Sequence, residues 1–217
     1  MDVRMFTVGP VQENSFLIRR DGSDHALLVD PGDEAPKLLG AIEALGVALD
    51  AILLTHCHFD HIGAVAPVAK ALGTPVYCPL IEVPILQDIM AYVPWEGFGP
   101  FDSWDPEHTV AGGEHLDLAG FGIDVLFTPG HSPGHVTYAI SEAPDGPVAL
   151  FSGDVLFQSS VGRTDLPGGD HATLLASIAG LLERFDDMTV VHPGHMGLTT
   201  LGAERANNPF LTELSAQ

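Results

Sequence analysis

Short runs of apolar residues alternate along the chain with polar turns, and the period of the apolar positions changes along the way. Three β-like runs separated by Gly, Pro and Asp predict an opening antiparallel meander: residues 3–8, 14–19 and 26–29. Residues 34–45 then place apolar side chains at helical spacing, with Asp33 as the candidate cap and Gly46 as the candidate stop. Residues 51–54 predict a buried strand after this helix.

The remainder of the chain repeats this order of strands and helices. Residues 62–72 predict a helix in which Pro67 is a defect, and residues 80–108 are too irregular to assign and are expected to form a lid or a substrate wall. The other segments predict four strands, one helix and a final strand: residues 76–78, 123–127, 136–140, 148–151, 172–184 and 189–191. This rhythm predicts an α/β fold in which two sheets pack face to face with helices outside.

Length and composition favour a single domain. A chain of 217 residues that is 46% hydrophobic can bury the core of one domain and leaves no room for a second of ordinary size, so we expect one domain over residues 1–217. No apolar run reaches membrane-spanning length, and the opening MDVRMFTVGP lacks the layout of a secretory signal. We therefore expect a cytoplasmic protein without a membrane partner, in which Cys57 and Cys78 are free thiols.

The charge of the chain is strongly negative. Twenty-nine acidic residues face eight basic ones, which gives a formal net charge of −21. Such a surface repels the phosphate backbone of nucleic acids, so a nucleic-acid partner is not expected. A small-molecule substrate is the expected partner, and the sequence leaves the oligomeric state open.

The hexapeptide HCHFDH follows the buried strand at residues 51–54, where open α/β sheets bind their ligands. In a locally extended segment His56 and His58 point the same way, and Asp60 and His61 can turn toward a second position nearby. One loop can thus supply ligands to two metal ions. Imidazole nitrogen and carboxylate oxygen suit divalent zinc, iron or manganese.

Further His and Asp residues recur beside strand-like runs and turns. TPGHSPGH carries His131 and His135, FSGDVLF carries Asp154, and VHPGH ends in His195. Spacing alone does not decide between His131 and His135, nor between His195 and His192.

The order THCHFDH, PGHSPGH, SGD and PGH resembles the metallo-β-lactamase superfamily, and within it the type II glyoxalases, over nearly the whole chain. The stretches SSVGRTDLPGGDHATLL and GAERANNPFL further resemble the short, single-domain bacterial members of that group, the hydroxyacylglutathione hydrolases. The resemblance implies a four-layer αββα sandwich of two mixed β-sheets with helices on the outer faces.

The resemblance also implies a set of metal ligands, with zinc as the first candidate for both ions. One metal would be held by His56, His58 and His135, and the other by Asp60, His61 and His195, with Asp154 bridging them. Asp60 and Asp154 would act in catalysis together with a metal-bound hydroxide. On this reading His131 and His192 are structural.

The implied reaction is hydrolysis of an acyl-thiol thioester such as S-lactoylglutathione. Two metals lower the pKa of a shared water toward neutrality, and a thiolate leaves without a strong general acid. The chain departs from the longer type II glyoxalases, because only 22 residues follow His195 and it has two lysines, Lys37 and Lys70, to hold glutathione carboxylates. Another thiol carrier is therefore an alternative substrate.

Other activities remain as alternatives. A persulfide dioxygenase would use a single iron, for which a triad of His56, His135 and Asp154 fits. A β-lactamase is disfavoured because those enzymes generally lack a bridging aspartate, and a lactonase or a non-catalytic metal-binding module are further alternatives. Metal stoichiometry and oxygen uptake separate the iron enzyme from the hydrolase.

The remaining polar and aromatic residues are expected to have structural roles. Arg163 is expected to pair with Asp165, and an alternating strand would turn Cys57 away from the metals. Four histidines are expected at the surface: His25, His108, His115 and His171. Four aromatic residues form either a cleft wall or a small core: Trp95, Phe98, Phe101 and Trp104.

Overall fold

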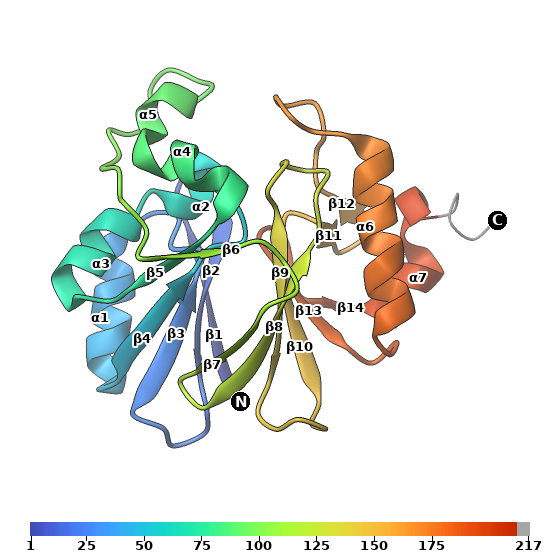
Figure 1. The fold of residues 1–217 in the computed structure, drawn as a ribbon, viewed down its shortest axis with the longest axis horizontal. Coiled ribbons are helices and arrows are strands. Elements are labelled where there is room, and N and C mark those ends of the chain that lie inside the picture. The colour runs from blue at the N-terminus through green and yellow to red at the C-terminus, as the bar shows by residue number, and fades with distance from the viewer. Residues whose placement is uncertain (212–217) are drawn as a thin grey trace.

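The computed structural model describes residues 1–211 and forms the four layers that were expected (Figure 1). Two six-stranded sheets lie face to face at the centre, and helices cover the outer face of each sheet. In Figure 1 the helices of the first half lie on the left and those of the second half on the right. The α/β sandwich predicted from the sequence is confirmed.

The first sheet contains the strands of the first half in chain order. It begins as an antiparallel meander of β1, β2 and β3 and continues with parallel pairing from β3 through β6, so it is mixed. Its strands are β1 (Asp2–Val8), β2 (Glu13–Arg19), β3 (His25–Val29), β4 (Ala48–Leu53), β5 (Val76–Pro79) and β6 (His108–Val110).

The second sheet has the order β14-β13-β10-β9-β8-β7 and is also mixed, because β10 and β13 are parallel whereas the other neighbours are antiparallel. A hairpin of β11 (Leu156–Phe157) and β12 (Ser160–Val161) stands apart from it. The strands of the sheet are β7 (His115–Leu118), β8 (Phe121–Phe127), β9 (Val136–Ser141), β10 (Val148–Gly153), β13 (Val190–Pro193) and β14 (Thr199–Thr200).

The helices divide between the two outer faces. Those of the first half are α1 (Ala35–Leu45), α2 (Phe59–Ile62), α3 (Val65–Leu72), η1 (Leu80–Glu82), α4 (Val83–Gln87) and α5 (Ile89–Tyr92). Those of the second half are α6 (His171–Arg184), α7 (Leu201–Asn207) and η2 (Pro209–Leu211). Within residues 1–211, no helix combines the length and the apolar character needed to cross a bilayer.

The alternation of side chains along the strands explains why both faces of each sheet are buried. On β2, Phe16 and Ile18 face the core between the two sheets, whereas Leu17 between them faces the helical layer with Leu38. From the second sheet, Tyr138 and other residues of β9 complete the core between the sheets. A strand covered on both faces reads as a continuous apolar run, which is why these segments were recognisable in the sequence.

Two local predictions about the helices of the first half are corrected. Asp33 does not cap α1, because the helix begins at Ala35 and the Asp33 carboxylate instead accepts the adjacent N–H of Glu34 at 2.6 Å. Gly46 does end α1, in the left-handed conformation with φ +65°. Pro67 is not a defect, because α3 begins at Val65 and the first turn of a helix does not need the N–H that proline lacks.

The unassigned segment 80–108 forms three short helical turns, η1, α4 and α5, and then an irregular stretch, residues 93–107, that leads into β6. Phe98, Phe101 and Trp104 pack partly buried against the core beneath the helical layer. Phe98 and Phe101 also line a cavity of about 370 Å³ beside Asp60 and Phe59. Phe98 and Phe101 therefore serve as a small core and as a cavity wall at once, whereas Trp104 packs against the core and Trp95 is 44% exposed.

Candidate metal centre

The candidate ligands converge because of how the strand ends are arranged. The segment after β4 carries His56 and His58 and leads into α2, whose first turn holds Asp60. Strands β10 and β13 are parallel, so Asp154 and His195 emerge at one edge of the second sheet. Strand β9 is antiparallel to β10, and the loop before it therefore reaches the same edge.

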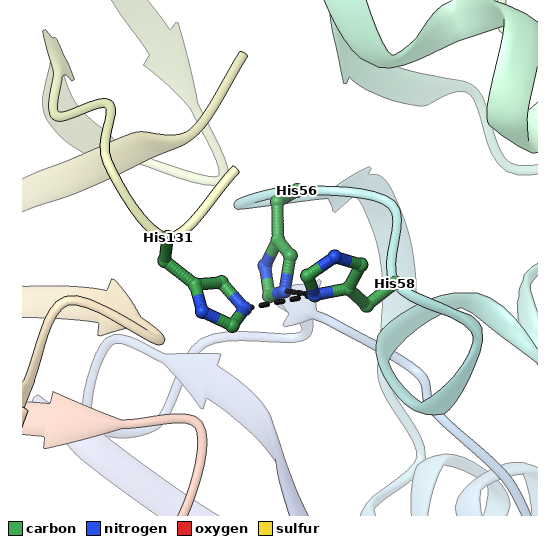
Figure 2. Close-up of side chains that lie close together, drawn as sticks. All are labelled: His56, His58 and His131. Carbon is green, nitrogen blue, oxygen red and sulfur yellow. Dashed lines mark hydrogen bonds between the residues drawn. The ribbon is translucent and has the colours of Figure 1, made fainter. Parts of the chain in front are cut away.

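One group of three imidazoles gathers His56, His58 and His131 (Figure 2). His58 Nδ1 lies 3.2 Å from His56 Nε2 and 2.8 Å from His131 Nε2. The three nitrogens point toward a common position between the two halves of the molecule, with His56 and His58 on one side and His131 on the other. This arrangement fits one divalent metal with nitrogen ligands.

A second group lies beside the first and contains Asp60, His61 and His195. His195 Nε2 is 3.3 Å from Asp60 Oδ2. Asp154 stands between the groups, since its Oδ1 is 3.4 Å from His61 Nε2 and its Oδ2 is 3.5 Å from His131 Nε2. One carboxylate therefore faces both groups, as a bridging ligand must.

The hydrogen bonds behind the rings fix which nitrogen is available to a metal. Nδ1 of His56 lies 3.0 Å from Thr55 Oγ1, and Nδ1 of His131 lies 2.7 Å from the carbonyl of Arg163. Nδ1 of His195 lies 3.3 Å from the carbonyl of Gln12. Each ring can donate its Nδ1–H to an oxygen acceptor, which leaves the lone pair of Nε2 directed at the centre.

His135 is placed differently from the sequence prediction. Its Nε2 accepts the backbone N–H of Asp154 at 3.1 Å, and its Nδ1 lies 3.1 Å from Thr128 Oγ1. An imidazole whose lone pair already accepts an amide N–H does not offer it to a cation. The geometry thus brings His131 to the centre and leaves His135 behind Asp154. A triad of His56, His135 and Asp154 for a single iron would need the same His135 nitrogen that already accepts the Asp154 N–H.

The sequence missed the buried acidic groups behind the ligands. Asp30, at the end of β3, accepts the N–H of Thr55 at 2.7 Å, the hydroxyl of Thr55 at 2.6 Å and Nδ1 of His61 at 3.1 Å. Glu13 Oε1 lies 3.7 Å from Nδ1 of His61, and burial raises the pKa of Glu13 well above its ordinary value. The sequence did offer a signal for Asp30, because this polar residue directly follows an apolar strand at the end where α/β sheets bind ligands.

Burial and neighbouring charges shift the pKa values of the two ligand groups in different directions. Burial lowers the pKa of His58 to about 4, and the ring of His131 adds to the effect, so His58 is neutral at pH 7. Burial disfavours the charged form of His61, yet the carboxylates of Asp154 and Asp60 raise its pKa. Burial likewise opposes the charge on Asp154, whose pKa His61 and His195 nonetheless hold below its ordinary value. The second group therefore holds a proton that a cation would displace.

Unpartnered polar atoms test whether a cation fits this centre. His61 Nε2 and Asp154 Oδ1 are buried and face each other at 3.4 Å, but neither atom makes a hydrogen bond among the described residues. Such atoms are costly in a folded protein unless a water or an ion satisfies them. Both belong to the ligand types that zinc, iron and manganese accept, so the residues present fit a metal.

The other residues singled out in the sequence lie outside the centre. His192 is buried between Phe16 and Phe151, whose ring centroids lie 5.4 Å and 4.5 Å from that of His192. Arg163 pairs with Asp165 through two contacts of 2.7 Å and 2.8 Å, as expected. Four histidines are exposed, which confirms the prediction: His25, His108, His115 and His171.

The two cysteines are free and buried, as expected. The thiols of Cys57 and Cys78 lie 3.5 Å apart beneath the ligand loop and face the helical core rather than the centre. Burial raises the pKa of the Cys57 thiol well above its ordinary value. A thiol held in its neutral form does not serve as a nucleophile, so Cys57 is a core residue.

Comparison with known proteins agrees with this architecture. A model of the metallo-beta-lactamase superfamily matches residues 8–195. The hydroxyacylglutathione hydrolase GloC of Haemophilus influenzae is 36% identical over 99% of this chain and 100% of its own length. The crystal structure of the BLEG-1 B3 metallo-beta-lactamase has 40% identity and a TM-score of 0.89, and covers 97% of this chain and 100% of its own. That of TTHA1623 in a di-iron-bound form has 44% identity and a TM-score of 0.81, with 96% and 100% covered.

The family model spans most of the chain, including every ligand loop described above, and the relatives match over their full length. Both sheets and the paired ligand groups agree with it. The chain therefore belongs to the metallo-beta-lactamase superfamily of metallo-hydrolases.

Proposed function

We propose that this protein hydrolyses acyl-thiol thioesters at a centre that holds two divalent metals. In this proposal His56, His58 and His131 hold one metal, and a second set of three holds the other: Asp60, His61 and His195. Asp154 bridges the two. The observation that carries the proposal is the position of Asp154, whose two carboxylate oxygens face His61 on one side and His131 on the other.

The protein's own residues prepare the centre for this chemistry. Two bound cations would lower the pKa of a water toward neutrality and polarise the thioester carbonyl. The backbone and side-chain acceptors behind the rings keep the Nε2 lone pairs of His56, His131 and His195 turned to the centre. A thiolate leaving group has a pKa near 8.5, so no strong general acid is needed among the residues around it.

An acylated thiol of the S-lactoylglutathione type is the first candidate substrate. The similarity to the hydroxyacylglutathione hydrolase GloC over 99% of this chain supports this choice. The cavity beside Asp60 has aromatic walls at Phe59 and Phe101 and carboxylates at Asp33 and Glu34, so it favours an uncharged part of a substrate over a glutathione carboxylate. A thioester of an uncharged thiol is therefore the second candidate.

Zinc is the first candidate metal, and iron and manganese are the alternatives. Neutral imidazoles such as His58 suit all three. The di-iron-bound form of TTHA1623 supports iron as an occupant of such a centre. Metal preference is therefore part of the test.

The test measures thiol release from S-lactoylglutathione and from the lactoyl thioester of N-acetylcysteamine. Purified protein is stripped of metal and loaded in turn with zinc, manganese and iron. We expect turnover that depends on metal and that Asp154→Asn lowers by about 100-fold. Asp124→Asn is the matched control, since Asp124 pairs with His115 at 2.7 Å on the exposed edge of the second sheet, and it should keep full activity.

Three further readouts separate the alternatives. Two metals per chain without nitrocefin turnover support the thioesterase. One iron per chain, with oxygen consumed in the presence of glutathione persulfide and no thiol released from either thioester, would replace it with a dioxygenase. Nitrocefin hydrolysis that Asp154→Asn leaves intact would contradict the bridging role of Asp154.

A further inference from the structure

Glu82 is a buried carboxylate in contact with both ligand loops. It ends η1, and only 1% of its surface is exposed. Its Oε2 accepts the N–H of Cys57 at 3.3 Å, and its Oε1 accepts the N–H of Gly134 at 2.7 Å and the hydroxyl of Ser132 at 2.9 Å. All three donors are neutral groups of the chain.

Two of the three donors lie directly beside candidate ligands. Cys57 separates His56 from His58 in the loop that follows β4, and Ser132 follows His131 in the loop between β8 and β9. These loops come from different sheets. Glu82 therefore joins, through one side chain, the two segments whose imidazoles must meet at 2.8 Å between His58 and His131.

The contact is close on the side of the second loop. A methyl group at Gly134 would come within 2.7 Å of Glu82 Cγ and Oε1, so the backbone of this loop lies directly against the carboxylate. A carboxylate loses its hydration when it is buried, and several N–H and O–H donors are needed to offset that loss. The loop must therefore lie this close to Glu82 for its N–H and O–H groups to satisfy the buried carboxylate.

We propose that Glu82 is a positioning residue that clamps the two ligand loops and so sets the geometry of the His56, His58 and His131 group. The proposal rests on the proposed function only in so far as this group holds a metal. Two acceptor oxygens are required, one for each loop. Glutamine has the same shape but a single acceptor oxygen, so Glu82→Gln leaves one loop facing an NH₂ donor instead of an acceptor.

The test measures Co²⁺ affinity by competition with a chromogenic chelator, together with the visible absorption of the Co²⁺ protein, which reports ligand geometry. Glu82→Gln is expected to weaken binding of the first ion by about 10- to 100-fold and to shift the absorption bands. Glu204→Gln is the matched control. Glu204 is also buried and accepts hydrogen bonds from Ser159 N and Asn208 Nδ2, both at 2.8 Å, and from the hydroxyl of Thr199. None of these donors is adjacent in the chain to a candidate ligand.

A purely structural role would make both variants less stable while leaving the Co²⁺ affinity and spectrum of each unchanged. Unchanged affinity and spectrum in Glu82→Gln, or an equal loss in Glu204→Gln, overturns the proposal. If Glu82→Gln does not fold, Ser132→Ala removes one of the three hydrogen bonds and is expected to weaken Co²⁺ binding by roughly 5-fold; no change in that variant also overturns it.

The same titration separates this inference from the proposed function. Wild-type protein that binds no Co²⁺ overturns the metal centre, and the clamp with it. Wild-type protein that binds two Co²⁺ ions while Glu82→Gln binds them equally well overturns the clamp alone and leaves the thioesterase standing.

Discussion

Replacing Asp30 by asparagine should weaken the metal centre through the proton on His61, although Asp30 itself need not touch a metal. Asp30 Oδ2 accepts Nδ1–H of His61 at 3.1 Å and the Thr55 hydroxyl at 2.6 Å, while Oδ1 accepts the Thr55 N–H at 2.7 Å. When a cation displaces the second proton of His61, this carboxylate therefore keeps the remaining proton on Nδ1 and leaves the Nε2 lone pair facing the centre. Through the Thr55 hydroxyl it also supports His56.

An asparagine at this position has one acceptor oxygen for the same three donors. If that oxygen keeps the Thr55 N–H, the NH₂ group faces Nδ1 of His61, and the ring proton moves to Nε2, where the metal should bind. If the amide is flipped, its NH₂ opposes the buried Thr55 N–H instead. Leaving a buried donor unsatisfied costs about 1–3 kcal/mol.

The expected size of the effect follows from two independent estimates. Loss of a partner behind a ligating histidine typically lowers metal affinity by about 10- to 100-fold. That range corresponds to about 1.4–2.7 kcal/mol, which agrees with the cost of the unsatisfied donor. We therefore expect Asp30→Asn to lower the affinity for the second ion, in the group that contains His61, by one to two orders of magnitude.

The assay is a competition titration with zinc at pH 7, followed to two equivalents. Asp50→Asn is the matched control, because Asp50 pairs with His25 at 2.7 Å at the exposed end of the first sheet and should leave both zinc sites unchanged. Equal zinc affinity in Asp30→Asn and wild type would refute the argument that Asp30 sets the tautomer of His61. An equal loss in both variants would trace the effect to surface charge instead.

Three other perturbations test separate parts of the structure. Burial lowers the pKa of His192 to about 4, below the unfolded value of about 6.5, so its contribution to stability is complete above pH 6.5 and falls as the pH drops toward 4. Between pH 7 and pH 5 the free energy of unfolding of the metal-free protein should fall by roughly 2 kcal/mol through this group. Urea unfolding of His192→Phe should lack this fall, and an equal dependence of stability on pH in variant and wild type would contradict the argument. Gly194→Ala places a methyl group against Asp154 Oδ1 and His61 Cε1, so the variant should bind fewer zinc ions per chain than the wild type. A variant that still binds two zinc ions would contradict the argument that the backbone must approach these ligands closely. Tyr138→Phe leaves the carbonyl of Leu54 without the hydroxyl that donates to it at 2.9 Å, so it should lower the free energy of unfolding by about 1–3 kcal/mol, and an unchanged urea midpoint would count against it.

The predictable part of the fold follows from local pattern. Strands such as β2 and β4 are buried on both faces and read as apolar runs, and α1 ends at Gly46 because a left-handed residue stops a helix there. The segment 80–108 could not be assigned, because its three helical turns are only three to five residues long and are held by packing against the core. Turns that short carry no periodic signal.

The candidate centre divides in the same way. The hexapeptide around His56 could be recognised because its ligands lie within one loop, and its residues do converge. The choice between His131 and His135 could not be made from spacing, because both follow a turn in the same loop. The structure separates them by their hydrogen bonds. Nε2 of His135 accepts the backbone N–H of Asp154, whereas Nε2 of His131 lies 2.8 Å from Nδ1 of His58, which is itself a candidate ligand.

The sequence by itself determined the α/β layers, the ligand types and the loop that starts the centre, because these depend on short-range periodicity and on residue chemistry. Only the tertiary structure decided which histidine completes the first group, that Asp154 faces both groups, and that Asp30 and Glu82 support the ligands from behind. These features depend on contacts between segments far apart in the chain. Such contacts are set by how the two sheets pack, and no local pattern records them.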